Sequence, residues 1–120
     1  MDYRSSTAGV SGSHTGCRQI DSARAQELIN EQNALVVDVR EPHEYAAGRI
    51  PNAELIPLRQ IGSHIESLRQ QDDRPIILSC RTGSRSEMAC RFLREGGLDN
   101  VYNLASGLMG WRNANLALTR

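Results

Sequence analysis

Short apolar runs that alternate with segments of helical periodicity constrain the fold of this chain more than any other feature of its sequence. Two of the runs, residues 34–39 (ALVVDV) and 76–79 (IILS), are typical of strands buried on both faces. Between them, residues 58–69 carry apolar side chains at helical spacing. Strands separated by helices pair in parallel through right-handed crossovers, and the helices then cover both faces of the sheet. The sequence therefore predicts an α/β fold, a three-layer α/β/α domain with a mainly parallel central sheet.

The remaining predicted elements are shorter. We expect strands over residues 18–20, 53–56 and 101–104, and helices over residues 42–47 and 107–113. A helix should also begin after an N-cap at Asp21 or Ser22. A further helix should end at Gly96-Gly97, and its expected buried side consists of Met88, Ala89, Phe92 and Leu93. Trp111 is expected to close the core.

The first 16 residues differ in composition from the rest of the chain. Nine of them are Ser, Thr or Gly, and a segment with so few apolar side chains cannot offset the entropy that ordering costs. We expect residues 1–16 to be a flexible, dispensable leader and residues 17–120 to form one domain. No apolar h-region follows Met1, and no apolar run approaches the roughly 18–20 residues of a membrane helix. These features predict a cytoplasmic protein without membrane contact.

The charged residues and the cysteines exclude several function classes. Fourteen basic and fourteen acidic residues balance, which argues against a general nucleic-acid binder. Every basic residue is arginine, so lysine-based Schiff-base chemistry is excluded. Cys17, Cys80 and Cys90 form no CxxC pair and lie at no zinc-like spacing from histidine, so no metal site is predicted. An odd cysteine count without an export signal predicts reduced thiols. We expect Cys90 to have a packing role and Cys17 to have none.

One loop, Cys80-Arg81-Thr82-Gly83-Ser84-Arg85-Ser86, concentrates the chemistry between a buried strand and a helix start. Backbone N–H groups at such a junction can point inward and form an anion cradle, with the first residue at its floor. These dipoles and the two arginines should favour the thiolate of Cys80 over the thiol. Gly83 permits the turn, and Ser86 either caps the helix or donates its hydroxyl to the thiolate. We therefore predict that Cys80 is a nucleophile; a buried structural cysteine is the alternative. The residues expected to bind substrate are Arg81, Thr82, Gly83, Ser84, Arg85 and Ser86.

Sites in open α/β sheets form at the carboxyl ends of the strands, so residues 38–40 and 104–107 also become candidates. Asp38 is expected to orient Arg85 or the loop N–H groups, and Arg40 to pair with Glu44. A purely structural ion pair is the alternative interpretation of these supporting residues.

Three segments in this order resemble the rhodanese (sulfurtransferase) family: residues 35–53 (LVVDVREPHEYAAGRIPNA), 76–86 (IILSCRTGSRS) and 101–111 (VYNLASGLMGW). The resemblance implies the α/β/α fold and an enzyme of the thiosulfate sulfurtransferase class. Cys80 would take a sulfane sulfur from a small-molecule donor such as thiosulfate and pass it, as a persulfide, to a thiol or cyanide acceptor. A sulfur-relay protein is a further candidate partner, and no metal or organic cofactor is implied. The chain departs from the family at Arg49, where His is frequent, and at Ser106-Gly107, where Gly-Gly is frequent.

The length of the loop distinguishes sulfur transfer from phosphate-ester hydrolysis, the main alternative reaction. Four residues lie between Cys80 and Arg85, whereas the related cysteine phosphatases have five, which widens the cradle for phosphate. The shorter loop favours sulfur transfer. A phosphatase or arsenate reductase with a tight loop stays open, with Asp38 and Glu44 as candidate general acids. A non-catalytic module, in which Cys80 is a redox sensor and the domain binds a partner, is the other alternative.

Overall fold

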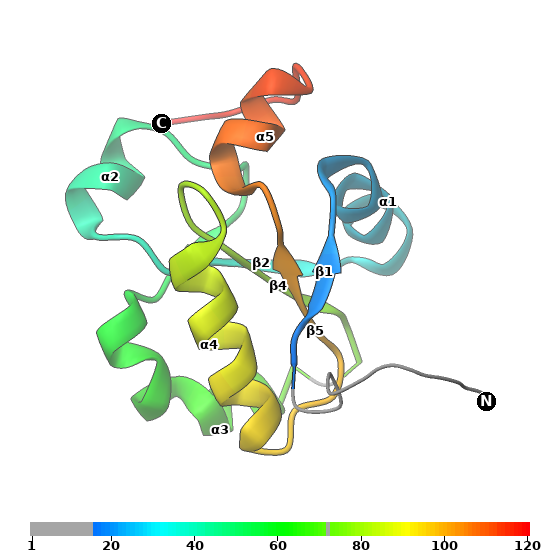
Figure 1. The fold of residues 1–120 in the computed structure, drawn as a ribbon, viewed down its shortest axis with the longest axis vertical. Coiled ribbons are helices and arrows are strands. Elements are labelled where there is room, and N and C mark those ends of the chain that lie inside the picture. Colours follow the sequence, from blue (N-terminus) through cyan, green and yellow to red (C-terminus); the bar gives the residue numbers. More distant parts are fainter. Residues whose placement is uncertain (1–15, 72) are drawn as a thin grey trace.

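A five-stranded parallel sheet lies at the centre of the computed structural model, which describes residues 16–71 and 73–120 (Figure 1). Its strand order is β1-β5-β4-β2-β3. The strands are β1 (Arg18–Ile20), β2 (Leu35–Asp38), β3 (Glu54–Leu55), β4 (Ile76–Ser79) and β5 (Val101–Leu104). Every residue of β2 and β4 is buried, as their apolar sequences predict. The parallel α/β prediction is confirmed.

Helices cover both faces of the sheet (Figure 1). One layer consists of α1 (Ser22–Gln32) and α5 (Gly107–Asn113), and the other of the 3₁₀ helix η2 (Leu58–His64), α3 (Ile65–Arg69) and α4 (Ser84–Glu95). The short helix α2 (Pro42–Ala47) follows β2. On β4, Ile77 packs with the α1 and α5 layer, whereas Ile76 and Leu78 pack with the α4 layer. This alternation is the period-two pattern of a strand between two apolar layers. Trp111 is buried in the first of these layers, as predicted.

Two predicted helices differ from the sequence expectation. The segment 58–69 divides into η2 and α3 instead of forming one α-helix. On α4 the buried residues are Ser86, Ala89, Cys90 and Leu93, so the prediction that Met88 and Phe92 face the core is wrong. Their exposed fractions are 61% and 47%. Because Ser86 and Cys90 lie one turn apart and both face the sheet, Met88 and Phe92 are turned to solvent.

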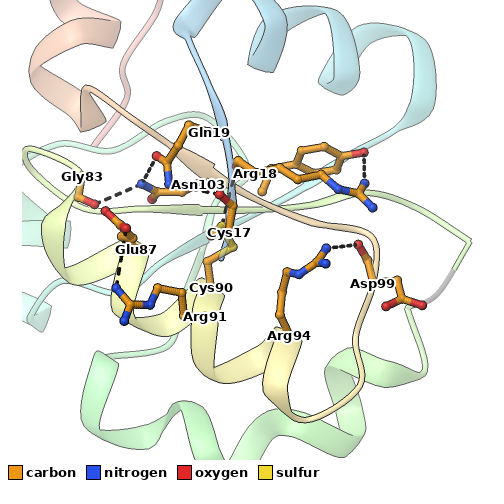
Figure 2. Close-up of a disulfide and its surroundings, with 11 residues drawn as sticks. Cys17, Arg18, Gln19, Gly83, Glu87, Cys90, Arg91, Arg94, Asp99 and Asn103 are labelled. Atoms are coloured by element: carbon orange, nitrogen blue, oxygen red, sulfur yellow. Dashed lines mark hydrogen bonds and ion pairs between the residues drawn. A yellow bond between two sulfur atoms is a disulfide. The ribbon is translucent and has the colours of Figure 1, made fainter. Parts of the chain in front are cut away.

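A disulfide joins Cys17 to Cys90, so the prediction of three reduced thiols is wrong (Figure 2). Parallel pairing of β1 with β5 places the residues that precede β1 over α4, and the two Cα atoms lie 5.6 Å apart. Cys80 is the free cysteine among the described residues. Cys90 is fully buried, but its role is more than packing, and Cys17 has a structural partner. The predicted leader lies almost entirely outside the described residues.

Reduction of this disulfide should lower the free energy of unfolding by about 2–4 kcal/mol, because the bridge closes a loop of 73 residues. Urea denaturation of Cys80→Ser protein, with and without a dithiol reductant, measures the difference without interference from the third thiol. The double variant Cys17→Ser/Cys80→Ser is the control and should not respond to the reductant. Equal unfolding midpoints for oxidised and reduced protein would contradict the prediction.

Candidate active site

Cys80 lies directly after β4, at the carboxyl edge of the sheet, with β2 and β5 on either side. The loop that follows it turns back into α4, and its sulfur is enclosed, with 1% of the residue exposed. Three groups donate hydrogen bonds to Cys80 Sγ: the Gly83 N–H at 3.1 Å, the Ser86 N–H at 3.4 Å and the Ser86 hydroxyl at 3.4 Å. Of the two roles expected for Ser86, the structure assigns the hydroxyl to the sulfur.

These donors determine the ionisation of Cys80. Burial raises the pKa of the thiol, but hydrogen bonds from the Ser86 hydroxyl and from the N–H groups of Ser86, Gly83 and Thr82 lower it below its ordinary value. From the sequence, Arg81 and Arg85 are also expected to favour the thiolate. In the structure, hydrogen bonds to the sulfur are the main cause, and Arg85 is engaged by another partner.

Two glycines allow close packing around the loop. Gly83 has a φ of +102°, and a Cβ there would collide with the carbonyl of Ala105. Gly107, at the start of α5, has a φ of +61°, and a Cβ there would collide with the carbonyls of Cys80 and Arg81. The first turn of α5 thus lies directly against the loop.

The same turn binds the loop backbone. The Leu108 N–H donates to the Cys80 carbonyl at 2.9 Å and the Met109 N–H to the Arg81 carbonyl at 3.1 Å. N–H groups in the first turn of a helix have no acceptor within the helix. These two hydrogen bonds therefore give the N–H groups of α5 an acceptor and the loop carbonyls a donor. Sequence reasoning named residues 104–107 only as a strand end. The signal for their role was the glycine pair 83 and 107, which the fold brings together.

Two ion pairs flank the cradle, and both differ from the expected pairing. The Arg40 guanidinium binds the Asp38 carboxylate at 2.7–3.1 Å and also donates to the Gly48 carbonyl. Asp38 and Arg40 are two residues apart in extended chain, so their side chains share one side and pair locally. The expected pairs of Arg40 with Glu44 and of Asp38 with Arg85 are therefore wrong.

Arg85 instead reaches from α4 to Glu44 on α2, with N–O distances of 2.8 and 3.0 Å. The Arg85 hydrogen bond is the main reason that the pKa of Glu44 falls to about 2. This lowered pKa stabilises the fold above the unfolded pKa of Glu44, and the contribution is lost as pH falls toward about 2. The pair ties α2 to the first turn of α4.

A cationic pocket of about 610 Å³ adjoins the loop. It lies within the roughly 300–1,000 Å³ that is typical of small-molecule sites. Within residues 16–71 and 73–120, three of its arginines, Arg81, Arg112 and Arg120, form no ion pair. Its lining consists of Arg40, Glu44, Ala47, Gly48, Arg81, Leu108, Met109, Arg112, Leu118, Thr119 and Arg120. Of the remaining predicted loop residues, Thr82 and Ser84 are exposed and do not line the pocket.

Other kinds of site find less support in the described part of the chain. No group of three or more His, Cys, Asp or Glu side chains there could hold a metal ion. None of its helices has the length and the apolar character needed to cross a membrane.

Comparison with known proteins shows the family to which this chain is similar. A family model described as Rhodanese-like domain matches residues 21–114. A sulfurtransferase from Allochromatium vinosum is 35% identical over 101 residues, which cover 83% of this chain and 92% of that protein. The thiosulfate sulfurtransferase GlpE from Pseudoalteromonas translucida is 31% identical over 97 residues, covering 81% and 90%. The crystal structure of a rhodanese-related protein from Thermoplasma volcanium is similar with a TM-score of 0.70 at 30% identity, covering 85% of this chain and 97% of that one.

Replacing Ser86 with alanine should slow alkylation of Cys80 by iodoacetamide at pH 6 by about tenfold. The change removes one hydrogen bond to a charged group, worth roughly 1.5–3 kcal/mol, while the backbone donors stay. The pKa of Cys80 then rises, and less thiolate is present at pH 6. Peptide mapping across a pH series measures the rate at this residue alone. Ser67→Ala on α3 is the matched control, because the Ser67 hydroxyl donates only to the His64 carbonyl; equal profiles for the Ser86 variant and the control would refute the assignment.

Proposed function

Because this chain belongs to the rhodanese-like domain family, we propose that it is a sulfurtransferase of the thiosulfate sulfurtransferase class, with Cys80 as nucleophile and persulfide carrier. The observation that carries the proposal is a buried cysteine whose sulfur accepts three hydrogen bonds beside a pocket lined with arginine. Such donors favour a thiolate, which is the reactive form of cysteine. Arg81, Arg112 and Arg120, which form no ion pair in the described part of the chain, favour an anionic sulfur donor.

In the first half-reaction, the Cys80 thiolate attacks the outer sulfur of thiosulfate. A bond forms between Sγ and that sulfur, and the sulfur–sulfur bond of thiosulfate breaks. Its electron pair leaves with sulfite, and Cys80 holds the transferred atom as a persulfide. Arg81, at the edge of the loop and in the pocket, is placed to stabilise the charge of the donor and of the departing sulfite.

In the second half-reaction, a thiolate or cyanide attacks the outer sulfur of the persulfide. The bond to Sγ breaks, and its electron pair returns to Cys80 as a thiolate. The Gly83 and Ser86 donors that lower the pKa of Cys80 also stabilise this leaving group. The two steps together form a double displacement through a covalent intermediate.

The side chains around the loop favour this reaction over phosphate-ester hydrolysis. A phosphatase requires a general acid for the leaving alcohol, and Asp38 and Glu44 were the candidates. Asp38 is fully buried and bound to Arg40, and Glu44 is bound to Arg85. The Arg85 guanidinium, which would bind a phosphate, is engaged by the same Glu44 carboxylate. These contacts support the sulfur-transfer proposal.

Incubation with thiosulfate should increase the intact mass of the protein by one sulfur atom, and cyanide or a thiol should remove it. Cys80→Ser should abolish the gain, because a serine hydroxyl cannot form a persulfide. Aryl-phosphate hydrolysis should be absent. Phosphatase activity without persulfide formation would favour the phosphatase alternative, and the absence of both activities across several donors would favour a binding module.

Arg81→Ala should lower kcat/KM for thiosulfate by roughly 10–100-fold, if one charge-assisted contact contributes about 1.5–3 kcal/mol. Steady-state transfer to cyanide measures the effect. Arg91→Ala on α4 is the control, since Arg91 lies outside the pocket, near Glu87 at 3.8 Å. Equal losses in both variants would show a general charge effect and contradict a specific role for Arg81.

A further inference from the structure

A hydrogen-bonded chain connects Cys80 with the edge of the sheet. Figure 2 shows its part from Gly83 through Asn103 to Gln19. The Gly83 N–H donates to Cys80 Sγ, and the Gly83 carbonyl accepts from Asn103 Nδ2 at 3.1 Å. The same amide nitrogen donates to Gln19 Oε1 at 2.8 Å. Gln19 on β1 and Asn103 on β5 are direct register partners. The proposed nucleophile is thus linked to β1, the edge strand, through two side chains and one glycine.

The buried amide of Asn103 lowers the stability of the fold, and packing alone does not account for an asparagine at this position. The residue is 1% exposed, and its Oδ1 has no hydrogen-bond partner within the described residues. A buried acceptor without a partner is destabilising, and an apolar side chain of similar size would avoid that penalty. What asparagine supplies here is the amide nitrogen, whose two hydrogens are used by Gly83 and Gln19. Together with the Glu87 N–H, which also donates to the Gly83 carbonyl, it fixes the residue whose N–H contacts Sγ.

The Cys17–Cys90 disulfide connects the start of β1, the strand that carries Gln19, with α4 (Figure 2). Cys17 lies two residues before Gln19, and β1 has three residues that pair with β5 alone in the sheet. Cys90 lies one turn after Ser86 on α4, and both are fully buried. The bridge therefore joins the strand that supports Asn103 to the helix that carries the Ser86 donors.

We propose that Asn103 is a positioning residue for Cys80, and that the Cys17–Cys90 disulfide holds Asn103 in place through β1 and Gln19. Reduction of the disulfide then slows the reactions of Cys80. The inference rests on the proposed role of Cys80 as nucleophile. Because cytosolic thiols are kept reduced and disulfides persist in oxidising surroundings, the bridge makes the reactivity of Cys80 depend on the redox conditions around the protein.

A dithiol supplies the electrons for the reduction. One of its thiolates attacks Cys17 Sγ, on the half-buried side of the bridge, and forms a mixed disulfide. The Cys17–Cys90 bond breaks, and its electron pair leaves on Cys90 Sγ, which takes a proton. The second thiol of the reductant then displaces Cys17. Two electrons and two protons pass to the protein, and the dithiol becomes a cyclic disulfide.

Alkylation of Cys80 by iodoacetamide across a pH series, followed by peptide mapping, tests the proposal on the full chain. Oxidised protein is compared with protein reduced by dithiothreitol and desalted. At pH 6, reduction and Gln19→Ala should each slow alkylation by about 3–10-fold, and Asn103→Leu by about tenfold, with the midpoint of the pH profile moved upward. Gln19→Glu keeps the acceptor and should keep the wild-type profile. Gln26→Ala is the control, because Gln26 bonds only Asn30 on its own helix.

Identical pH profiles for oxidised and reduced protein would overturn the role of the disulfide. A lower melting temperature in Asn103→Leu and Gln19→Ala without a shifted midpoint would overturn the positioning role, since a purely structural residue gives that result. If Asn103→Leu does not fold, the alkylation profiles of the Gln19 variants and of the reduced protein test the proposal, because Gln19 is exposed and its replacement leaves the core unchanged. The readout does not require sulfur transfer: a shifted profile in a protein that thiosulfate does not load supports this inference and contradicts the proposed function.

Discussion

A thiolate buried at the end of β4 is stable only while the Ser86 hydroxyl and the surrounding backbone N–H groups donate hydrogen bonds to it. Burial alone raises the pKa of Cys80, and the donors from Gly83 and Ser86 reverse that effect. The direction of the net shift therefore depends on the positions of the Ser86 hydroxyl and of a few backbone N–H groups. Several other features hold these donors in position. Gly83 and Gly107 leave no room for a Cβ, the first turn of α5 binds the loop carbonyls, and Asn103 donates to the Gly83 carbonyl.

The supports come from all sides of the sheet edge. Residues after β5 hold the loop carbonyls, the pair of Asp38 with Arg40 closes the end of β2, and Arg85 ties α4 to Glu44 on α2. Parallel strands end at one edge, so segments that are far apart in sequence meet there. Hydrogen bonds within the loop lower the pKa of Cys80, and within the described residues Arg81, Arg112 and Arg120 of the pocket form no ion pair.

Local patterns in the sequence were enough to predict the architecture and the reactive loop. The buried runs of β2 and β4, Pro42 at the start of α2 and the small polar residues after Cys80 all reflect local requirements of backbone and burial. The partners of side chains could not be predicted in this way. Arg85 and Glu44 are 41 residues apart, and Cys17 and Cys90 are 73 apart, so their pairing depends on how the elements pack. The exposed face of α4 was missed because Met88 and Phe92 are apolar at helical spacing, and only the inward position of Ser86 reveals the true register.

The strand order also determines when the site can be completed as the chain folds. β1 is the first strand in the sequence, yet its partner in the sheet is β5, the last one, and residues 18–20 align with residues 102–104. Contacts between such distant segments close long loops and form slowly. β1 pairs in the sheet with β5 alone, so Gln19 can bind Asn103 only after the chain has been made as far as β5. The set of contacts behind Cys80 is therefore complete only when the first strand of the chain has joined the last.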